Sequence, residues 1–112
     1  MEKIKVKYDE EFDDLYVFKS DRKANFSVNL DELVIDIDSN NNISGIEIMD
    51  AANTISQFTP EKFSKEKLKN ITRAEIITSA KGNAMMVMMM LYYKEKLTEH
   101  KVPITIAMPT VR

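Results

Sequence analysis

The chain has 112 residues, of which 44% are hydrophobic and 30% charged, and this composition indicates one folded domain (residues 1–112) and excludes a disordered chain. It has no cysteine, which excludes disulfides, zinc–thiolate sites, iron–sulfur clusters and cysteine nucleophiles. The net charge of −2 is unevenly divided: residues 1–58 carry 6 Lys/Arg and 13 Asp/Glu, a net of −7, and residues 59–112 carry 10 and 5, a net of +5. Such asymmetry is typical of a basic face for an acidic partner, of two halves that pack together, or of copies that associate head to tail.

The first residues lack the apolar run of a secretion signal, since Lys3, Lys5 and Lys7 interrupt them. The longest apolar run, residues 84–93, is shorter than the roughly 20 residues that cross a bilayer. Secreted domains of this size often carry disulfides, and this chain carries none. We therefore expect a cytoplasmic protein without membrane contacts.

Residues 4–8 and 15–18 read as the first two strands. In the first, apolar and lysine residues alternate with period two, which is typical of a half-buried strand. The acidic stretch 9–13 between them predicts a hairpin with a charged loop. Residues 26–30 alternate again and predict a third, weaker strand.

Residues 33–38 and 43–48 form the clearest predicted hairpin, joined by the Asn-rich loop 39–42. Pairing Asp38 with Ile43 sorts the two faces. The aliphatic residues Leu33, Ile35, Ile37, Ile46 and Ile48 then share one side, and the acidic residues Asp36, Asp38 and Glu47 share the other. A slip of one residue would mix these sets, so we predict this register.

Two helical segments follow. Asp50 is positioned to cap a short helical turn over residues 51–56. A main helix is predicted over 60–69, with Thr59 as N-cap, Pro60 at the first helical position and Glu61 in the first turn. Phe58 and Phe63 have the spacing of a hydrophobic staple around that cap.

The last third of the chain returns to strand character. Residues 73–78 and 84–93 flank a turn at 81–83, and residues 102–108 form the last predicted strand. Pro103 and Pro109 place that strand at a sheet edge, because proline cannot donate to a ladder. The whole pattern predicts an α+β fold of seven or eight strands, built from antiparallel hairpins in a meander.

The segment from Asp36 to Glu47 has the ligand spacing of an EF-hand calcium loop. Its candidate metal ligands are Asp36, Asp38, Asn40, Asn42 and Glu47. An EF-hand needs helices on both sides, however, and here both flanks read as strands, with Glu47 opposite Val34 and far from the loop. We therefore favour a polar hairpin turn, with binding of calcium or another divalent cation as the alternative.

The run from Met85 to Met90 places Met86, Met88 and Met90 on one face of a strand and Met85, Val87 and Met89 on the other. A strand that is apolar on both faces is typical of the centre of a sheet. The alternatives are a strand shared with a partner, because methionine suits adaptable interfaces, and a Cu(I) site.

No catalytic group is predicted, and we expect neither an enzyme nor a cofactor. His100 is the only histidine and falls in the polar stretch 94–101, which reads as a solvated loop, so no nucleophile has an activating base. With Gly45 and Gly82 alone, no glycine-rich phosphate loop can form. The sequence pI of 5.4 argues against nucleic acid as a partner of the lysine-rich segment.

Residues 3–55 resemble a family of small archaeal and bacterial proteins known as domain of unknown function 2283. The resemblance rests on a Tyr-Asp turn, a Leu-Tyr strand, an Asp-rich hairpin and a Gly-Ile-Glu-Ile segment ending in Asp-Ala, here Tyr8-Asp9, Asp14 to Val17, Val34 to Asp38 and Gly45 to Ala51. The family implies a β-rich scaffold with no established activity, and the location of some members beside toxin-like proteins suggests an antitoxin or partner-binding role. It does not explain the basic residues 59–112.

Together these patterns lead us to expect a protein-interaction module that binds a protein partner or itself, with a homodimer as the simplest form. The methionine strand and the last strand are the candidate surfaces, since exposed strands recruit partners.

Overall fold

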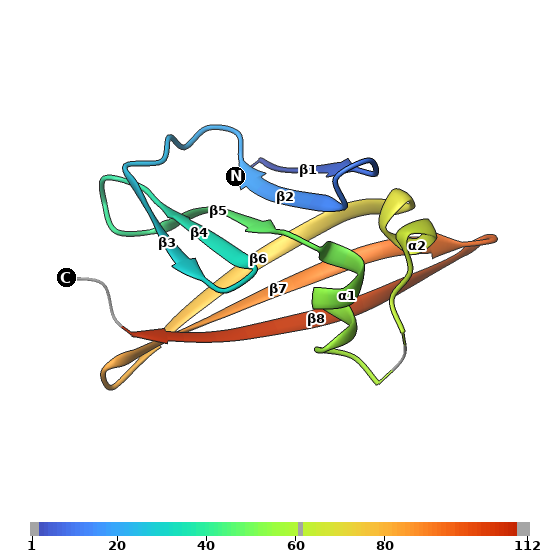
Figure 1. The fold of residues 1–112 in the computed structure, drawn as a ribbon. Helices are drawn as coiled ribbons and strands as arrows, with labels where there is room; N and C mark the ends of the chain where they lie inside the picture. The colour runs from blue at the N-terminus through green and yellow to red at the C-terminus, as the bar shows by residue number, and fades with distance from the viewer. Residues whose placement is uncertain (1–2, 61, 110–112) are drawn as a thin grey trace.

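The computed structural model describes residues 3–60 and 62–109, whose strands form two antiparallel sheets (Figure 1). The five-stranded sheet has the order β1-β2-β5-β4-β3 and consists of β1 (Ile4–Asp9), β2 (Asp14–Lys19), β3 (Phe26–Leu30), β4 (Leu33–Ile37) and β5 (Ile43–Ile48). The three-stranded sheet consists of β6 (Ile71–Lys81), β7 (Ala84–Glu95) and β8 (Thr98–Pro109), with β7 in the middle. Two short helices, α1 (Ala51–Ser56) and α2 (Lys65–Lys69), connect the sheets. The antiparallel sheets agree with the prediction, although the chain is richer in strand than a balanced α+β protein.

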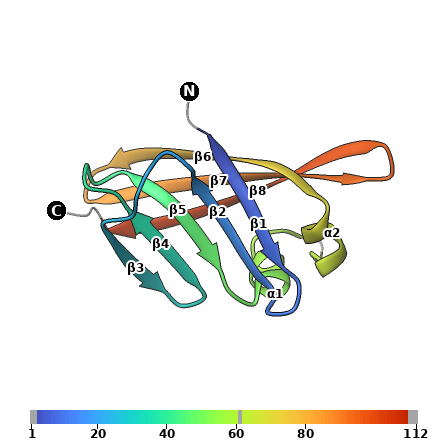
Figure 2. The same ribbon diagram turned by 90° about the horizontal axis from the view of Figure 1, so that it is seen from above.

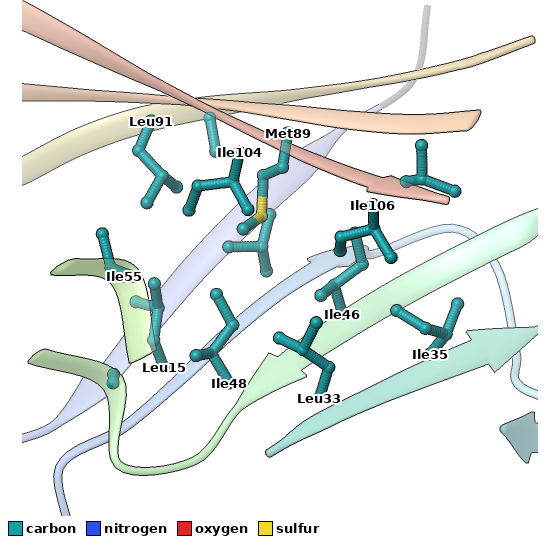
Figure 3. Packing of buried hydrophobic residues seen from close by; sticks show 14 of the residues in the cluster. Leu15, Leu33, Ile35, Ile46, Ile48, Ile55, Met89, Leu91, Ile104 and Ile106 are labelled. Atoms are coloured by element: carbon teal, nitrogen blue, oxygen red, sulfur yellow. The ribbon is translucent and has the colours of Figure 1, made fainter. Parts of the chain in front are cut away.

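The two sheets face each other across one hydrophobic core, and their strands run obliquely to one another when seen from above (Figure 2). Alternate residues of each strand point inward, so Leu15, Ile46 and Ile48 of the first sheet meet Met89 and Ile104 of the second (Figure 3). Each such side chain stabilises the fold by roughly 1.5–3 kcal/mol on burial. The core therefore ties the acidic half of the chain to the basic half.

The predicted main helix over 60–69 is wrong in extent, because α2 is only five residues long. Ser64, not Thr59, is the N-cap, and its Oγ accepts a hydrogen bond from the Lys67 N–H at 3.3 Å. The chain before it is held extended because the Phe63 N–H donates to Ser56 Oγ at 2.7 Å and the Phe63 ring is 3% exposed. Pro60 therefore lies outside the helix. The predicted staple of Phe58 and Phe63 is wrong as well, because no helix begins between them. The predicted role of Glu61 falls outside the described residues.

The short helix over 51–56 is confirmed as α1, but its predicted cap is not. Asp50 has a left-handed backbone (φ 50°) and its side chain makes no capping hydrogen bond. Asp13, from the turn between β1 and β2, takes that role: the Ala52 N–H donates to its carboxylate oxygens at 3.2 and 3.3 Å. The cap is thus tertiary, and comes from a residue 39 positions away.

The β4–β5 hairpin is confirmed, with Leu33 opposite Ile48, Val34 opposite Glu47 and Asp36 opposite Gly45. The predicted pairing of Asp38 with Ile43 is wrong, because a bulge leaves Ser44 unpaired and sets Ile37 opposite Ile43. Without that extra residue Ile43 would point outward; with it, Ile43 is 1% exposed and joins the core.

The three C-terminal strands are longer than predicted, and β8 is an edge strand as its prolines require. His100 lies in β8 opposite Tyr93, so the prediction that it sits in a loop is wrong. The turn between β6 and β7 has Gly82 at φ 62°, the left-handed conformation that glycine adopts readily. No helix in the described part of the chain has both the length and the apolar character to span a membrane.

Candidate functional site

Three acidic residues and a tyrosine come together on the outward face of the five-stranded sheet. They are Asp14 and Tyr16 of β2, Asp36 of β4 and Glu47 of β5, and we call them the carboxylate cluster. Cross-strand pairing explains the grouping, because Tyr16 lies directly opposite Glu47 in the β2–β5 ladder and Asp36 lies opposite Gly45 in the β4–β5 ladder. Residues up to 33 positions apart in the chain are thereby neighbours on one surface.

The Tyr16 side chain crosses β5 to reach Asp36, and its hydroxyl donates to Asp36 Oδ2 at 2.6 Å. The Ser27 hydroxyl donates to the other oxygen, Oδ1, at 2.6 Å. Gly45 makes the crossing possible, since a Cβ there would lie 3.0 Å from the Tyr16 hydroxyl and 3.2 Å from Asp36 Oδ2. The Phe18 ring stacks on Tyr16 with centroids 4.7 Å apart. Asp36 is thus fully engaged inside the sheet.

The electrostatics of the cluster favour protonated groups. A hydrogen bond with the Asp14 carboxyl, followed by partial burial, raises the pKa of Glu47 to about 7. Burial, followed by the hydrogen bond to Asp36, raises the pKa of Tyr16 to about 12, so its hydroxyl remains a donor at neutral pH. The raised pKa of Glu47 and the hydroxyl that Tyr16 donates to Asp36 both follow from the close approach of acidic groups on this face.

The three carboxylates among the predicted calcium ligands, Asp36, Asp38 and Glu47, are engaged in different contacts. Asp36 is held by Tyr16 and Ser27, and Glu47 lies opposite Val34, away from the loop. Asp38 is 4% exposed and turns into the loop, where its Oδ1 accepts from the N–H groups of Asn40 (2.9 Å) and Asn42 (3.0 Å).

These contacts make the loop a self-contained turn. The hydrogen bond from Asn42 is the main cause of the lowered pKa of Asp38, and Arg22 lies 3.3 Å from its Oδ2. Within residues 3–60 and 62–109, no three or more His, Asp or Glu side chains are grouped so that they could hold a metal ion.

A second buried network, missed by sequence reasoning, links the first turn to α1. The Tyr8 hydroxyl donates to Asp13 Oδ1 at 2.6 Å, and the Ala51 N–H donates to the Asp13 carbonyl at 2.9 Å. Burial and the Asp13 carboxylate hold the pKa of Tyr8 well above its ordinary value. Asp13 looked like one of five acidic residues in a solvated loop, and no local pattern distinguishes it from its neighbours.

The outward face of the three-stranded sheet is different in character. Its centre is lined by Met86, Met88 and Met90 of β7, all half-buried, and by Ile77 of β6, which is 53% exposed. Ala107, Thr105 and Pro103 of β8 lie opposite the three methionines. We call this surface, Ile77, Met86, Met88, Met90, Pro103 and Ala107, the methionine face. The predicted central strand is confirmed, but within the described part of the chain only its inner side is covered.

One end of that sheet carries a charged network. The Tyr92 hydroxyl donates to Glu75, the Arg73 guanidinium lies 3.6 Å above the Tyr92 ring, and an Arg73 nitrogen lies 3.3 Å from Glu99 Oε1. Both signs of charge thus border the methionine face.

Comparison with known proteins places the chain in a family. Residues 5–51 match the family described as "Protein of unknown function (DUF2283)". An uncharacterized protein of Methanocaldococcus jannaschii is 31% identical over 97 residues, which cover 87% of this chain and 79% of that protein. A Methanosarcina mazei protein named "Putative hypoxanthine phosphoribosyltransferase" is 30% identical over 102 residues, which cover 88% of this chain and 78% of that protein. No solved structure matches. The chain belongs to the DUF2283 family, whose matched region is the five-stranded sheet with the start of α1.

Proposed function

We propose that this protein is an interaction module that self-associates through the methionine face. The observation that carries the proposal is a row of three methionines, flanked by Ile77, at the centre of an outward sheet surface. In a two-layer antiparallel fold the outward face is ordinarily polar, as it is on the five-stranded sheet. An apolar patch on the outward face of the three-stranded sheet is typical of a surface that another molecule covers.

The size of the face suits a weak and reversible dimer. Three strands about 4.8 Å apart, with about 15 Å of apolar length from Met86 to Met90, offer on the order of 200 Å² per copy. Two such faces bury less than the roughly 1,200 Å² of a stable interface, even with some contribution from the rim. Methionine side chains are flexible and polarizable, so they can repack against a second set of methionines.

The charged rim favours a second copy over an unrelated partner. Arg73 of β6 and Lys101 of β8 lie on either side of Tyr92. Glu75 and Glu99 lie two residues further along the same two strands, and therefore on the same face. A two-fold axis brings a surface against itself, and a rim that contains both signs can then pair with its own copy. Addition of a strand to β8 is less favoured, because Pro103 and Pro109 interrupt its donors.

Sedimentation velocity of the wild type from about 5 μM to 1 mM tests the proposal. We expect a concentration-dependent dimer that Met88→Glu weakens at least tenfold, since a carboxylate at the centre of the face would be buried unpaired. Asn29→Glu adds the same charge to exposed β3 and is the matched control, expected to leave the dimer intact.

A wild type that stays monomeric at the highest concentration, or equal dimerisation of Met88→Glu, contradicts self-association. Melting curves of both variants exclude unfolding as the cause. An antitoxin-like role would use the same face for a different chain, and a heterodimer that replaces the homodimer would point to it.

We also propose that the protein is not an enzyme, although one relative is named for phosphoribosyl transfer. Its two glycines are far apart in the fold, Gly45 in β5 and Gly82 in the turn between β6 and β7, so the chain offers no glycine-rich phosphate cradle. Turnover of hypoxanthine with phosphoribosyl diphosphate would overturn this.

A further inference from the structure

A pocket of about 340 Å³ lies at the end of the three-stranded sheet that the five-stranded sheet does not cover. Strands β7 and β8 are 12 residues long, against five or six for β1 to β5, so the first sheet is too short to pack along their full length. The segment between α1 and α2 closes over this end instead (Figure 1). The pocket lies between that segment and β7 and β8, and it shares one lining residue, Pro103, with the methionine face.

Aromatic rings form its walls. Tyr93 stands on β7 with the Phe63 ring edge-on at 5.2 Å and the His100 ring stacked at 5.5 Å and an interplanar angle of 24°. Phe58, which is 38% exposed, and Pro103 complete the apolar lining. Phe63 and Tyr93 are buried and form the inner part of the lining, whereas Phe58 and His100 are exposed and offer their rings to a flat, apolar guest.

Cationic side chains supply the charge of the pocket. Lys67 of α2 and Lys101 of β8 both line it. The Lys67 ammonium lies 5.6 Å from the centroid of Phe63 and 5.7 Å from that of Tyr93, and it also lies 3.6 Å from Glu95 Oε1. None of the described residues that line the pocket is acidic. An anionic group there would meet the Lys67 ammonium beside the aromatic wall, in competition with Glu95, and Lys101 lines the edge of the same pocket.

We propose that this pocket binds a small planar aromatic anion, a ring that bears a carboxylate or phosphate. The ring would stack within the aromatic wall beside Tyr93 and His100, and the anionic group would lie at Lys67 and Lys101. Stacking alone accepts any flat molecule, whereas the ammonium groups select its charge.

Titration of the ¹⁵N-labelled full chain with 1-naphthoate, followed by amide NMR, tests the site. We expect saturable shifts at Lys67, His100 and Val102. Two matched probes separate the contributions: 1-naphthylmethylamine keeps the ring and reverses the charge, and cyclohexanecarboxylate keeps the charge and removes the aromatic ring. Each should bind at least tenfold more weakly than 1-naphthoate.

Substitutions of single lysines then identify which ammonium group contacts the carboxylate of 1-naphthoate. Lys67→Met keeps the aliphatic stem over the rings and should weaken 1-naphthoate binding at least fivefold. Lys69→Met removes the same charge from the same helix, where Lys69 contacts Glu10 (3.2 Å) and Glu66 (3.5 Å) outside the pocket, and should leave binding unchanged. Lys101→Met, on an exposed strand position, provides a second variant if Lys67→Met unfolds.

Equal affinity for the amine and the carboxylate, shifts centred on the methionine face, or no saturable shift up to about 5 mM naphthoate would each overturn the proposal. Loss of binding in Lys69→Met to the same degree as in Lys67→Met would do the same, since it would reduce the effect to overall charge.

Discussion

The outward faces of the two sheets differ in chemistry: one is polar and hydrogen-bonded within its own sheet, and the other is apolar at its centre. On the five-stranded sheet the central polar side chains have partners within the same sheet: Tyr16 and Ser27 satisfy Asp36, and Glu47 shares a hydrogen bond with Asp14. On the three-stranded sheet the centre is methionine and isoleucine, with no part of the described chain above it. The first surface is largely satisfied by contacts within its own sheet, and the second is the one that we propose a second copy covers.

This difference teaches what the family signature encodes. Its Tyr-Asp, Leu-Tyr, Asp-rich and Gly-Ile-Glu-Ile segments supply Tyr8, Tyr16, Asp36, Gly45 and Glu47, and each is engaged in a contact within the fold. The signature residues are therefore scaffold residues, and substitution there should cost stability. Substitution on the methionine face should instead change association.

Asp13→Ala should have the largest effect on stability, because it removes the acceptor of the Tyr8 hydroxyl and of the Ala52 N–H together. Loss of a buried charged acceptor costs about 2–4 kcal/mol. Asp50→Asn is the matched control, since asparagine tolerates the left-handed backbone of Asp50 and the Asp50 side chain makes no capping hydrogen bond. Urea denaturation should show a loss of about 0.5 kcal/mol or less for it. Equal losses in the two variants would mean that α1 is capped locally after all.

Gly45→Ala should follow, with a loss of about 1–3 kcal/mol, because the new methyl group would push the Tyr16 hydroxyl away from Asp36. Tyr16→Phe alone should cost about 1 kcal/mol. The double variant should be less unstable than the sum, since the methyl group then displaces no hydrogen bond. Thermal melts of the four proteins give this coupling, and strict additivity would contradict the crossing of Tyr16 over Gly45.

Glu47→Gln should change how the free energy of unfolding depends on pH more than it changes the free energy of unfolding at any one pH. The folded-state pKa of Glu47 is raised from 4.5 to about 7, so the stability it contributes is present below about pH 4.5 and is lost as pH rises through 7. Asp38 acts in the opposite sense, because its pKa is lowered and its contribution is lost as the solution becomes acidic. Denaturation at several values between pH 5 and 8 should show a decline in the wild type that the variant lacks, since a glutamine amide can still donate to Asp14. A parallel decline in both would assign the effect to other groups.

Local pattern was sufficient where a residue's partners are close in sequence. The alternation of Leu33, Ile35 and Ile37 against Ile46 and Ile48 predicted the hairpin and four of its pairs, since side chains on a strand alternate by geometry alone. Local pattern failed to predict the pairing near the loop. The bulge at Ser44 turns Ile43 into a core that includes the second sheet, and no nearby residue signals this. Local pattern failed also at α2, where the Phe63 N–H donates to Ser56 Oγ and the Phe63 ring is buried, and the helix begins only after Ser64.

The amino-acid sequence by itself determined the strands, the edge position of β8, the family and the two-sided apolar character of β7. These follow from period-two alternation, proline chemistry and segment order, all of which are written along the chain. Only the tertiary structure decided that Asp13 caps α1, that Tyr16 meets Asp36 across Gly45, and that one side of β7 is left outward. Each of these depends on which distant strands become neighbours, and the pairing of β2 with β5 is selected by the burial of a shared core and not by any short stretch of residues.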